Sequence, residues 1–273
     1  MSEKTVFVSG SFFRMQSPVI RFLEEAAKLG RVHVLLWVNE PDEAVPSGSM
    51  KFTVEERQYL LMNNRYVSSV TITEEGKGQF VLPLQKEARP DIWVVREKDD
   101  LESYRAFCER HDIQCHVIKD STLTGFPHLP LPRQPSGRKK VVVTGCFDWF
   151  HSGHVRFFEE ASTYGDLYVV VGSDSNLRLL KGEEHPMFSQ EERRYVVQSI
   201  RFVTQALIST GAGWMDAEPE IERIQPDIYI VNEDGDQPEK REFCRQHGLE
   251  YVVLKREPKP GLPRRSSTNL RGF

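Results

Sequence analysis

Short apolar runs alternate with helix-length segments along the chain. The runs predict strands at 5–8, 32–38, 92–95 and 116–118, and again at 141–144, 167–172, 228–231 and 251–254. The clearest amphipathic helix patterns cover about 18–29 and 153–164. Apolar strands that alternate with helices are typical of parallel sheets covered on both faces. The pattern predicts a Rossmann-like, doubly wound α/β fold, in which ligands bind beyond the carboxyl ends of the strands where the strand order reverses.

The two halves of the chain are similar to each other in sequence. Residues 10–39 align without a gap onto 145–174, and ten of the thirty positions are identical. The match continues in nearly the same register through later segments, so we predict two tandem copies of one domain. The predicted boundaries are 1–125 for the first copy, 126–138 for a Pro- and Gly-rich linker, and 139–273 for the second copy.

Each copy carries a helix start signal after its second predicted strand. Thr53 is followed three residues later by Glu56, and Ser189 is followed by Glu192. A hydroxyl residue with an acidic residue at this spacing is the pattern of a capping box. We therefore expect a helix to begin after Thr53 and another after Ser189.

Composition narrows the class of protein. The 273 residues carry 36 Lys and Arg against 40 Asp and Glu, a formal net charge of −4, so no cationic field for nucleic acid is expected. No apolar run approaches the roughly 20 residues of a membrane span, and no signal-peptide core is recognised at the start. The four cysteines lack CxxC spacing, which favours buried thiols over zinc or disulfides. We expect a soluble, cytoplasmic protein without membrane insertion.

The two copies differ most just after their first strand. Residues 145–154 read GCFDWFHSGH, whereas Gln16 and Val19 stand at the positions of His151 and His154. The spacing places two imidazoles on one side of a helix N-terminus, where free N–H groups and the helix dipole favour an anion, and a glycine between them lets a ligand approach the backbone. The pattern predicts a phosphate-binding site in the second copy, with surface histidines that bind nothing as the alternative.

Residues 145–154 resemble the GxFDxxHxGH signature of the cytidylyltransferase group of nucleotidyltransferases. This group includes choline-, ethanolamine- and glycerol-phosphate cytidylyltransferases and heptose-phosphate adenylyltransferases. Lys181-Gly182, followed by 192–193, resembles the family's Lys-Gly and Glu-Arg segment, and 199–203 resembles its IRYVD motif. Residues 265–271 resemble the second signature, RTEGISTT, but its Arg-Thr-x-Gly lead is displaced by 257–264, which leaves Arg256 and Arg265 as alternatives for the family arginine.

The resemblance implies that a phosphate oxygen of an acceptor attacks the α-phosphorus of a nucleoside triphosphate and releases pyrophosphate. His151 and His154 would hold and neutralise the triphosphate, and Lys181 would bridge the two reacting phosphates. Cys146 is expected to contribute its backbone rather than a nucleophilic thiol. Mg²⁺ is expected on the substrate phosphates without a dedicated protein cage, with Asp234 as a candidate contact to it or to the ribose. The further nucleotide-binding residues implied are Gly145, Cys146, Phe147, Asp148, Gly153, Arg201, Asn232, Asp234, Arg265, Ser266, Ser267 and Thr268.

The resemblance leaves the substrates open. CTP is slightly favoured as the donor and a small phosphorylated alcohol or sugar phosphate as the acceptor, whereas the Lys181 spacing and the Ser-Ser-Thr-Asn segment favour adenylyl transfer of the heptose-phosphate type. A nucleotide-sensing or scaffold protein with little turnover is the alternative from another class, and it is supported by Thr204 in place of the motif's aspartate and by the altered lead into Ser266.

The first copy is expected to be an inactive, structural domain. It lacks both histidines, has Lys98 where the second copy has Asp234, and has 130–132 where the second copy has its hydroxyl run. By analogy with dimeric relatives we expect it to pack on the second copy as one subunit packs on another, and a homodimer of the whole chain fits the same analogy.

Overall fold

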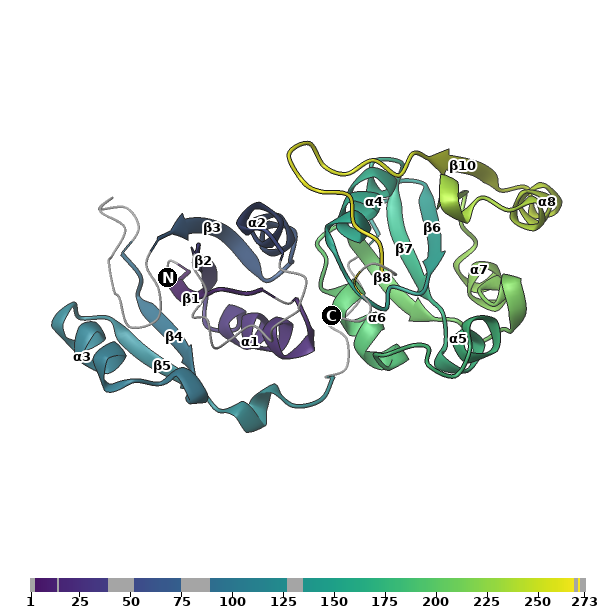
Figure 1. Ribbon diagram of the computed structural model, residues 1–273. Coiled ribbons are helices and arrows are strands. Elements are labelled where there is room, and N and C mark those ends of the chain that lie inside the picture. Colours follow the sequence, from purple (N-terminus) through teal and green to yellow (C-terminus); the bar gives the residue numbers. More distant parts are fainter. Residues whose placement is uncertain are drawn as a thin grey trace. The chain divides into compact units, whose positions relative to one another are not determined.

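Each half of the chain folds around one parallel five-stranded sheet with helices packed against it (Figure 1). The computed structural model describes residues 3–13, 15–38, 52–74, 89–126, 135–267 and 270. The chain divides into unit 1, residues 1–125, and unit 2, residues 126–272. Most of the expected linker, 127–134, lies outside the described residues, and so does Thr268.

Unit 1 contains the first sheet. Its elements are β1 (Thr5–Gly10), α1 (Ser17–Ala27), β2 (Arg31–Trp37), α2 (Val54–Met62), β3 (Val67–Thr73), β4 (Ile92–Arg96), η3 (Glu97–Asp99), α3 (Glu102–Arg110), β5 (Gln114–Ile118) and η4 (Asp120–Leu123). The strand order is β3-β2-β1-β4-β5, and every pair is parallel.

Unit 2 contains the second sheet. Its elements are β6 (Lys140–Gly145), α4 (Ser152–Ser162), β7 (Asp166–Val171), α5 (Asp174–Lys181), α6 (Gln190–Gln198), β8 (Val203–Ile208), η5 (Gly213–Met215), α7 (Glu218–Ile224), β9 (Ile228–Asn232), η6 (Glu233–Gly235), α8 (Pro238–His247) and β10 (Glu250–Leu254). The strand order is β10-β9-β6-β7-β8, so strands counted from the start of each unit have the same order in both sheets.

The apolar runs explain the central strands. All six residues of β7 are buried, and Val141, Val142 and Val143 of β6 are fully buried. Strands buried on both faces need helices above and below them, and that requirement gives the doubly wound architecture predicted from the sequence. Among the described helices, none combines the length and apolarity that a bilayer crossing requires.

The order of strands fixes where a ligand can enter unit 2. From β6 the chain builds outward through β7 and β8, then returns to place β9 on the other side of β6. The reversal therefore lies between the carboxyl ends of β6 and β9, at Gly145 and Asn232. Connections leave in opposite directions at such a point, so a crevice opens there.

Candidate functional site

A cavity of about 500 Å³ opens at this reversal point. Residues from β6, β9, the first turns of α4, the end of α5, α8 and the carboxy-terminal segment line it. They are Thr144, Gly145, Cys146, Phe147, Asp148, His151, Gly153, His154, Phe157, Lys181, His185, Val231, Asn232, Asp234, Gly235, Lys240, Arg256, Ser266 and Ser267. The cavity thus brings together twelve of the predicted site residues, together with Arg256, one of the two candidates for the family arginine.

A strained turn carries the chain from β6 toward α4. Phe147 has a positive φ of 53°, which is uncommon for a bulky side chain. Its ring is buried over Gly145, where an added Cβ would lie 2.8 Å from Phe147 Cζ. The same ring contacts His154 edge-on, with centroids 5.3 Å apart. Gly145 is therefore required by the ring of Phe147, which in turn forms part of the wall of the cavity.

His151 caps α4 with one ring nitrogen and keeps the other buried beside the cavity. Its Nδ1 accepts a hydrogen bond from Gly153 N at 3.1 Å, so the neutral ring carries its proton on Nε2. His151 is fully buried, and Nε2 has no hydrogen-bond partner among the described residues. A buried donor without a partner is costly unless a ligand supplies the acceptor. His154 stacks on this ring at a centroid distance of 3.9 Å.

The packing of His151 also explains the glycine between the histidines. A Cβ on Gly153 would lie 2.9 Å from His151 Cε1, so this glycine makes room for the imidazole. The N–H groups of Gly153 and His154 already bond His151 Nδ1 and His151 O. The expectation that free N–H groups of this turn hold the anion is therefore wrong for these two amides, because the capping histidine satisfies both. The donor of this turn that has no partner among the described residues is the imidazole Nε2–H.

Both histidines are held in the neutral form. Burial lowers the pKa of His151 well below its ordinary value, and the neighbouring His154, Arg256 and Arg265 act in the same direction. Burial, followed by the charges of Arg256 and Lys181, lowers the pKa of His154 to about 3. Near pH 7 in the ligand-free protein the histidines are therefore hydrogen-bonding groups rather than cations, and neutralisation of a bound triphosphate by them stays a prediction.

The positive charge of the cavity comes from lysine and arginine. Lys181 is the last residue of α5, where Gly182 with φ of 94° ends the helix, and its side chain is exposed at the cavity. Its charge contributes to lowering the pKa of His154. Lys240, on α8, also lines the cavity and donates to Gly235 O at 3.1 Å, while burial lowers its pKa.

Two predicted residues take roles in holding the loops. The Asp148 carboxylate accepts hydrogen bonds from the backbone N–H groups of Met187 and Phe188, which fastens the loop after α5 to the signature segment. Burial raises the pKa of Cys146, so its thiol stays protonated, as expected for a residue that is not the nucleophile.

The two candidate arginines of the carboxy-terminal segment, Arg256 and Arg265, line different spaces. Arg256 lines the cavity, forms an ion pair with Asp234 and donates to Arg265 O at 3.1 Å. Arg265 lines a smaller neighbouring pocket instead. Ser266 and Ser267 reach the cavity as expected, and Ser267 Oγ lies 3.4 Å from Trp149 O.

Besides Arg265, one further predicted residue does not line the cavity, and two basic or imidazole residues that do line it were missed. Arg201 precedes β8, at the amino end of that strand and away from the carboxyl edge where the cavity opens. Lys240 and His185 line the cavity but were not recognised in the sequence. Lys240 aligns with Tyr104 in the repeat, so a break in the repeat was the available signal for it.

The cavity offers no metal cage of its own within the described residues. The one described cluster with three carboxylate or imidazole ligands is Glu218, Glu222 and His247, on α7 and at the end of α8, and none of these lines the cavity. Asp234 is already paired with Arg256. The side chains present therefore fit a metal that is held mainly by substrate phosphates and waters.

A parallel α/β sheet with imidazole donors, ammonium groups and hydroxyls gathered at its reversal point defines a domain that binds nucleotide phosphates. A family model described as cytidylyltransferase-like matches residues 142–272. The FAD synthase of Ferroglobus placidus is 38% identical over 120 residues, 43% of this chain and 75% of that protein. The FAD synthase of Aciduliprofundum boonei is 35% identical over 119 residues, 42% of this chain and 76% of that protein.

The bifunctional protein HldE of Aliarcobacter butzleri is 32% identical over 111 residues, which are 40% of this chain and 23% of HldE. The chain therefore spans about a quarter of that relative. These similarities identify the chain as a member of the cytidylyltransferase-like family, and as a nucleotidyltransferase.

Proposed function

We propose that the protein transfers a nucleoside monophosphate from a nucleoside triphosphate to a phosphate oxygen of a small phosphorylated acceptor. The new bond joins that oxygen to the α-phosphorus, the bond between the α-phosphorus and its bridging oxygen breaks, and pyrophosphate leaves. The observation that carries the proposal is the buried Nε2–H of His151, which has no partner among the described residues and belongs to a residue that lines the same cavity as Lys181 and Ser266.

The residues have separate tasks in this reaction. The Nε2–H of His151 donates to a phosphate oxygen, and His154 fixes the orientation of that ring by stacking on it. Lys181 stabilises the negative charge shared by the attacking and transferred phosphates as a mobile point charge. Ser266 and Ser267 supply hydroxyl groups on the side of the carboxy-terminal segment. A magnesium ion bound by the phosphates would supply further charge stabilisation.

ATP is the donor that we propose, with CTP as the alternative. Two of the similar proteins are named FAD synthase, and FAD contains an adenylyl group joined through a pyrophosphate linkage. The spacing of Lys181 and the Ser-Ser-Thr-Asn segment favour the same group. We propose no nucleotide chemistry for unit 1, in which Gln16 and Val19 replace the two histidines.

The test is thermal unfolding of the whole chain with magnesium and each of ATP, CTP, GTP and UTP. A nucleotide that binds the folded state raises stability by about 2.7 kcal/mol at a hundred times its dissociation constant. We expect ATP to stabilise the wild type and the control variant His247→Ala, whose exposed histidine lies outside the cavity. We expect no stabilisation of His154→Ala, and a turnover in that variant lower by about 10²–10³.

Each other outcome has a distinct meaning. If CTP alone stabilises the protein, the donor is CTP instead of ATP, and the proposed site stands unchanged. Stabilisation by a nucleotide without pyrophosphate release for any phosphorylated acceptor would favour the nucleotide-sensing alternative. Wild-type turnover in His154→Ala would overturn the proposed roles of the histidine pair.

A further inference from the structure

Lys240 lines the main cavity of unit 2 but has no task in the proposed reaction. It lies on α8 and donates a hydrogen bond to Gly235 O at 3.1 Å. The repeat aligns it with Tyr104 of unit 1, which is buried in a core cluster of that unit. Unit 2 therefore has an ammonium group at its cavity where unit 1 has an aromatic core residue.

The helices that carry the site lie on opposite faces of the second sheet. Ile221 of α7 and Phe243 of α8 belong to one buried cluster with Tyr229 of β9, so these two helices cover the same face. Figure 1 shows α4 on the other side of this sheet. His151 at the start of α4 and Lys240 on α8 therefore reach the cavity from opposite faces.

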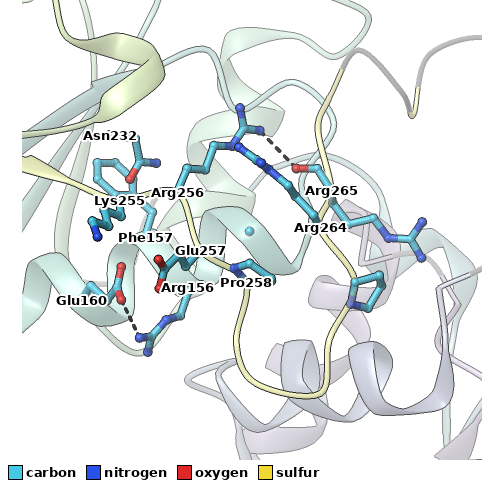
Figure 2. A pocket seen from close by; sticks show the side chains of 12 residues that line it. Arg156, Phe157, Glu160, Asn232, Lys255, Arg256, Glu257, Pro258, Arg264 and Arg265 are labelled. Atoms are coloured by element: carbon cyan, nitrogen blue, oxygen red, sulfur yellow. Dashed lines mark hydrogen bonds and ion pairs between the residues drawn. The ribbon is translucent and has the colours of Figure 1, made fainter.

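The carboxy-terminal segment belongs to the side of α4. Lys259 in this segment forms an ion pair with Glu159 of α4 at 2.6 Å. Figure 2 shows the smaller neighbouring pocket, where Arg256 at the start of the segment is bonded to the carbonyl of Arg265 near its end. The proposed function assigns the Nε2–H of His151 to a phosphate oxygen of the donor, so we expect the pyrophosphate to leave on this side.

The side from which the acceptor attacks follows from the geometry of displacement at phosphorus. The attacking and leaving oxygens lie in line on opposite sides of the phosphorus, so the acceptor phosphate must come from the side of α7 and α8. The end of α5 belongs to that side, because Asn176 of α5 is held to Gly213, shortly before α7, by hydrogen bonds of 2.7 and 3.1 Å. We therefore expect the acceptor between Lys181, at the end of α5, and Lys240.

The ammonium group of Lys240 is available to a ligand. It forms no ion pair within the part of the chain that the structure describes, although three carboxylates act on its charge. Each carboxylate already has another partner: Asp216 with Ser209, Asp234 with Arg256, and Asp236 with Arg241. An ammonium group has three N–H donors, and Gly235 O accepts one of them. The remaining two can donate to oxygen atoms of a bound molecule.

We propose that Lys240 selects the acceptor by donating hydrogen bonds to hydroxyl oxygens of a polyol or sugar phosphate and by repelling acceptors that carry a cationic group. The inference rests on the proposed function and narrows its acceptor to a phosphate with a neutral, oxygen-rich body. A second cation beside a half-buried ammonium group is repelled, because water screens the two charges poorly there. Phosphorylated amino alcohols are therefore excluded.

The test measures pyrophosphate release by the whole chain with magnesium and the triphosphate that stabilises it. The neutral acceptors are glycerol 3-phosphate, ribose 5-phosphate and flavin mononucleotide, and the cationic acceptors are phosphoethanolamine and phosphocholine. We expect the best neutral acceptor to exceed both cationic ones in kcat/KM by about a hundredfold or more. In Lys240→Met the KM for that acceptor should rise by about tenfold or more, the effect of losing a hydrogen bond from a charged donor. The KM for the triphosphate should stay within about twofold of the wild type.

Two variants control for charge and for folding. Lys240→Arg keeps the positive charge, so it should keep the preference for neutral acceptors even where its turnover falls. Lys139→Met removes a lysine from an exposed position outside the cavity and should match the wild type in every value. Thermal stabilisation by the triphosphate, measured for each variant, shows that the donor site is still folded.

The outcomes separate this inference from the proposed function. Turnover of phosphoethanolamine or phosphocholine at the rate of the neutral acceptors would overturn the inference and leave the function standing. An unchanged KM for the acceptor in Lys240→Met would do the same, and so would a raised KM for the triphosphate alone, because the lysine would then contact the donor. A wild type that binds a triphosphate but releases no pyrophosphate with any acceptor would overturn the function and the inference together.

Discussion

The first strand of each unit ends in the same turn. A glycine is followed two residues later by a phenylalanine with left-handed backbone, Phe12 with φ of 48° in unit 1 and Phe147 with φ of 53° in unit 2. In both turns the ring lies over the glycine, so that an added Cβ would be 3.1 Å from Phe12 or 2.8 Å from Phe147. Because the strained turn occurs in a unit without the histidine pair, strain at this position belongs to the scaffold and is not evidence of chemistry.

The units also share a buried arginine brace. Arg193 donates to Cys146 O at 2.6 Å and to Gly172 O at 2.8 Å, which ties the loop after β6 to the end of β7. In unit 1, Arg57 donates to Ser11 O at 2.6 Å and Trp37 O at 3.0 Å, the corresponding positions after β1 and at the end of β2.

The units differ in the residue that caps the next helix. His151 caps α4 through its ring nitrogen, whereas Gln16 precedes α1 without a side-chain cap, and a proline occupies the first turn of α1. The features that occur in both units hold the carboxyl edge of the sheet together. The features that occur only in unit 2 supply hydrogen-bond donors and charge to that edge. The comparison therefore separates residues that build the fold from the residues that we propose to bind the nucleotide.

The largest effect is expected from removing a brace. Arg193→Met leaves three carbonyl acceptors and the Asp174 carboxylate without their donor in a site that is 1% exposed. We expect the free energy of unfolding to fall by about 3–5 kcal/mol, the range for breaking a buried charged network. Urea unfolding monitored by circular dichroism measures the loss.

Arg57→Met is the matched variant in unit 1, and we expect a similar loss of stability from it. Under conditions where both variants stay folded, nucleotide binding should weaken in Arg193→Met and not in Arg57→Met. A large loss in one variant and none in the other would show that the two arginines are not equivalent parts of a shared scaffold.

Lowering the pH should have an intermediate effect on the free energy of unfolding, and this effect should originate in unit 2. The folded protein lowers the pKa values of His151 and His154, the latter to about 3, whereas the unfolded chain takes up protons near pH 6.5. Below pH 6.5 the unfolded state therefore binds more protons, and stability is lost as pH falls. For each histidine we expect a loss of about 1.4 kcal/mol per pH unit between pH 6.5 and 5, measured by urea unfolding.

The control compares how steeply the free energy of unfolding falls with pH, and not the free energy itself. His154→Gln removes one titrating group and should reduce the loss between pH 6.5 and 5, while His247→Gln, at an exposed position outside the cavity, should leave it unchanged. Equal slopes in all three proteins would mean that the histidines are protonated in the folded state and that unit 2 holds them as cations.

The alternation of apolar runs was sufficient to predict the doubly wound fold and the central strands. The first helix of each unit, predicted at about 18–29 and 153–164, is observed at Ser17–Ala27 and Ser152–Ser162. Two strands, β3 and β8, were missed. Both lie at a sheet edge, where polar residues are tolerated, and their sequences VSSVTIT and VTQALI contain no long apolar run.

The site residues that could be predicted are those that have a suitable side chain and also stand at a distinctive position in the sequence. His151, His154 and Lys181 stand out because unit 1 lacks the histidines and because the motif order is kept. The protonation states of the histidines could not be predicted, since burial decides them and burial depends on Phe147 and the carboxy-terminal segment. Nor could the choice between Arg256 and Arg265, because an inserted segment can direct either one inward.

The smallest effect is expected from removing the helix caps, which the sequence predicts in both units. In unit 1, Thr53 and Glu56 form the full capping box, with Thr53 Oγ1 accepting from Glu56 N at 3.3 Å and Glu56 Oε2 accepting from Thr53 N at 3.0 Å. In unit 2, Ser189 Oγ accepts from Glu192 N at 3.2 Å. Thr53→Ala and Ser189→Ala should each lower the free energy of unfolding by about 1 kcal/mol.

The capped helices differ in what they support. The helix after Ser189 carries the Arg193 brace, which bonds Cys146 of the cavity wall, so fraying of its first turn should also loosen Cys146 and Gly172. Ser189→Ala should therefore increase amide exchange at the carboxyl ends of β6 and β7, whereas Thr53→Ala should increase it only around α2 in unit 1. Hydrogen exchange followed by mass spectrometry distinguishes the two, and exchange that rises at the cavity in Thr53→Ala would contradict the separation of scaffold and site between the units.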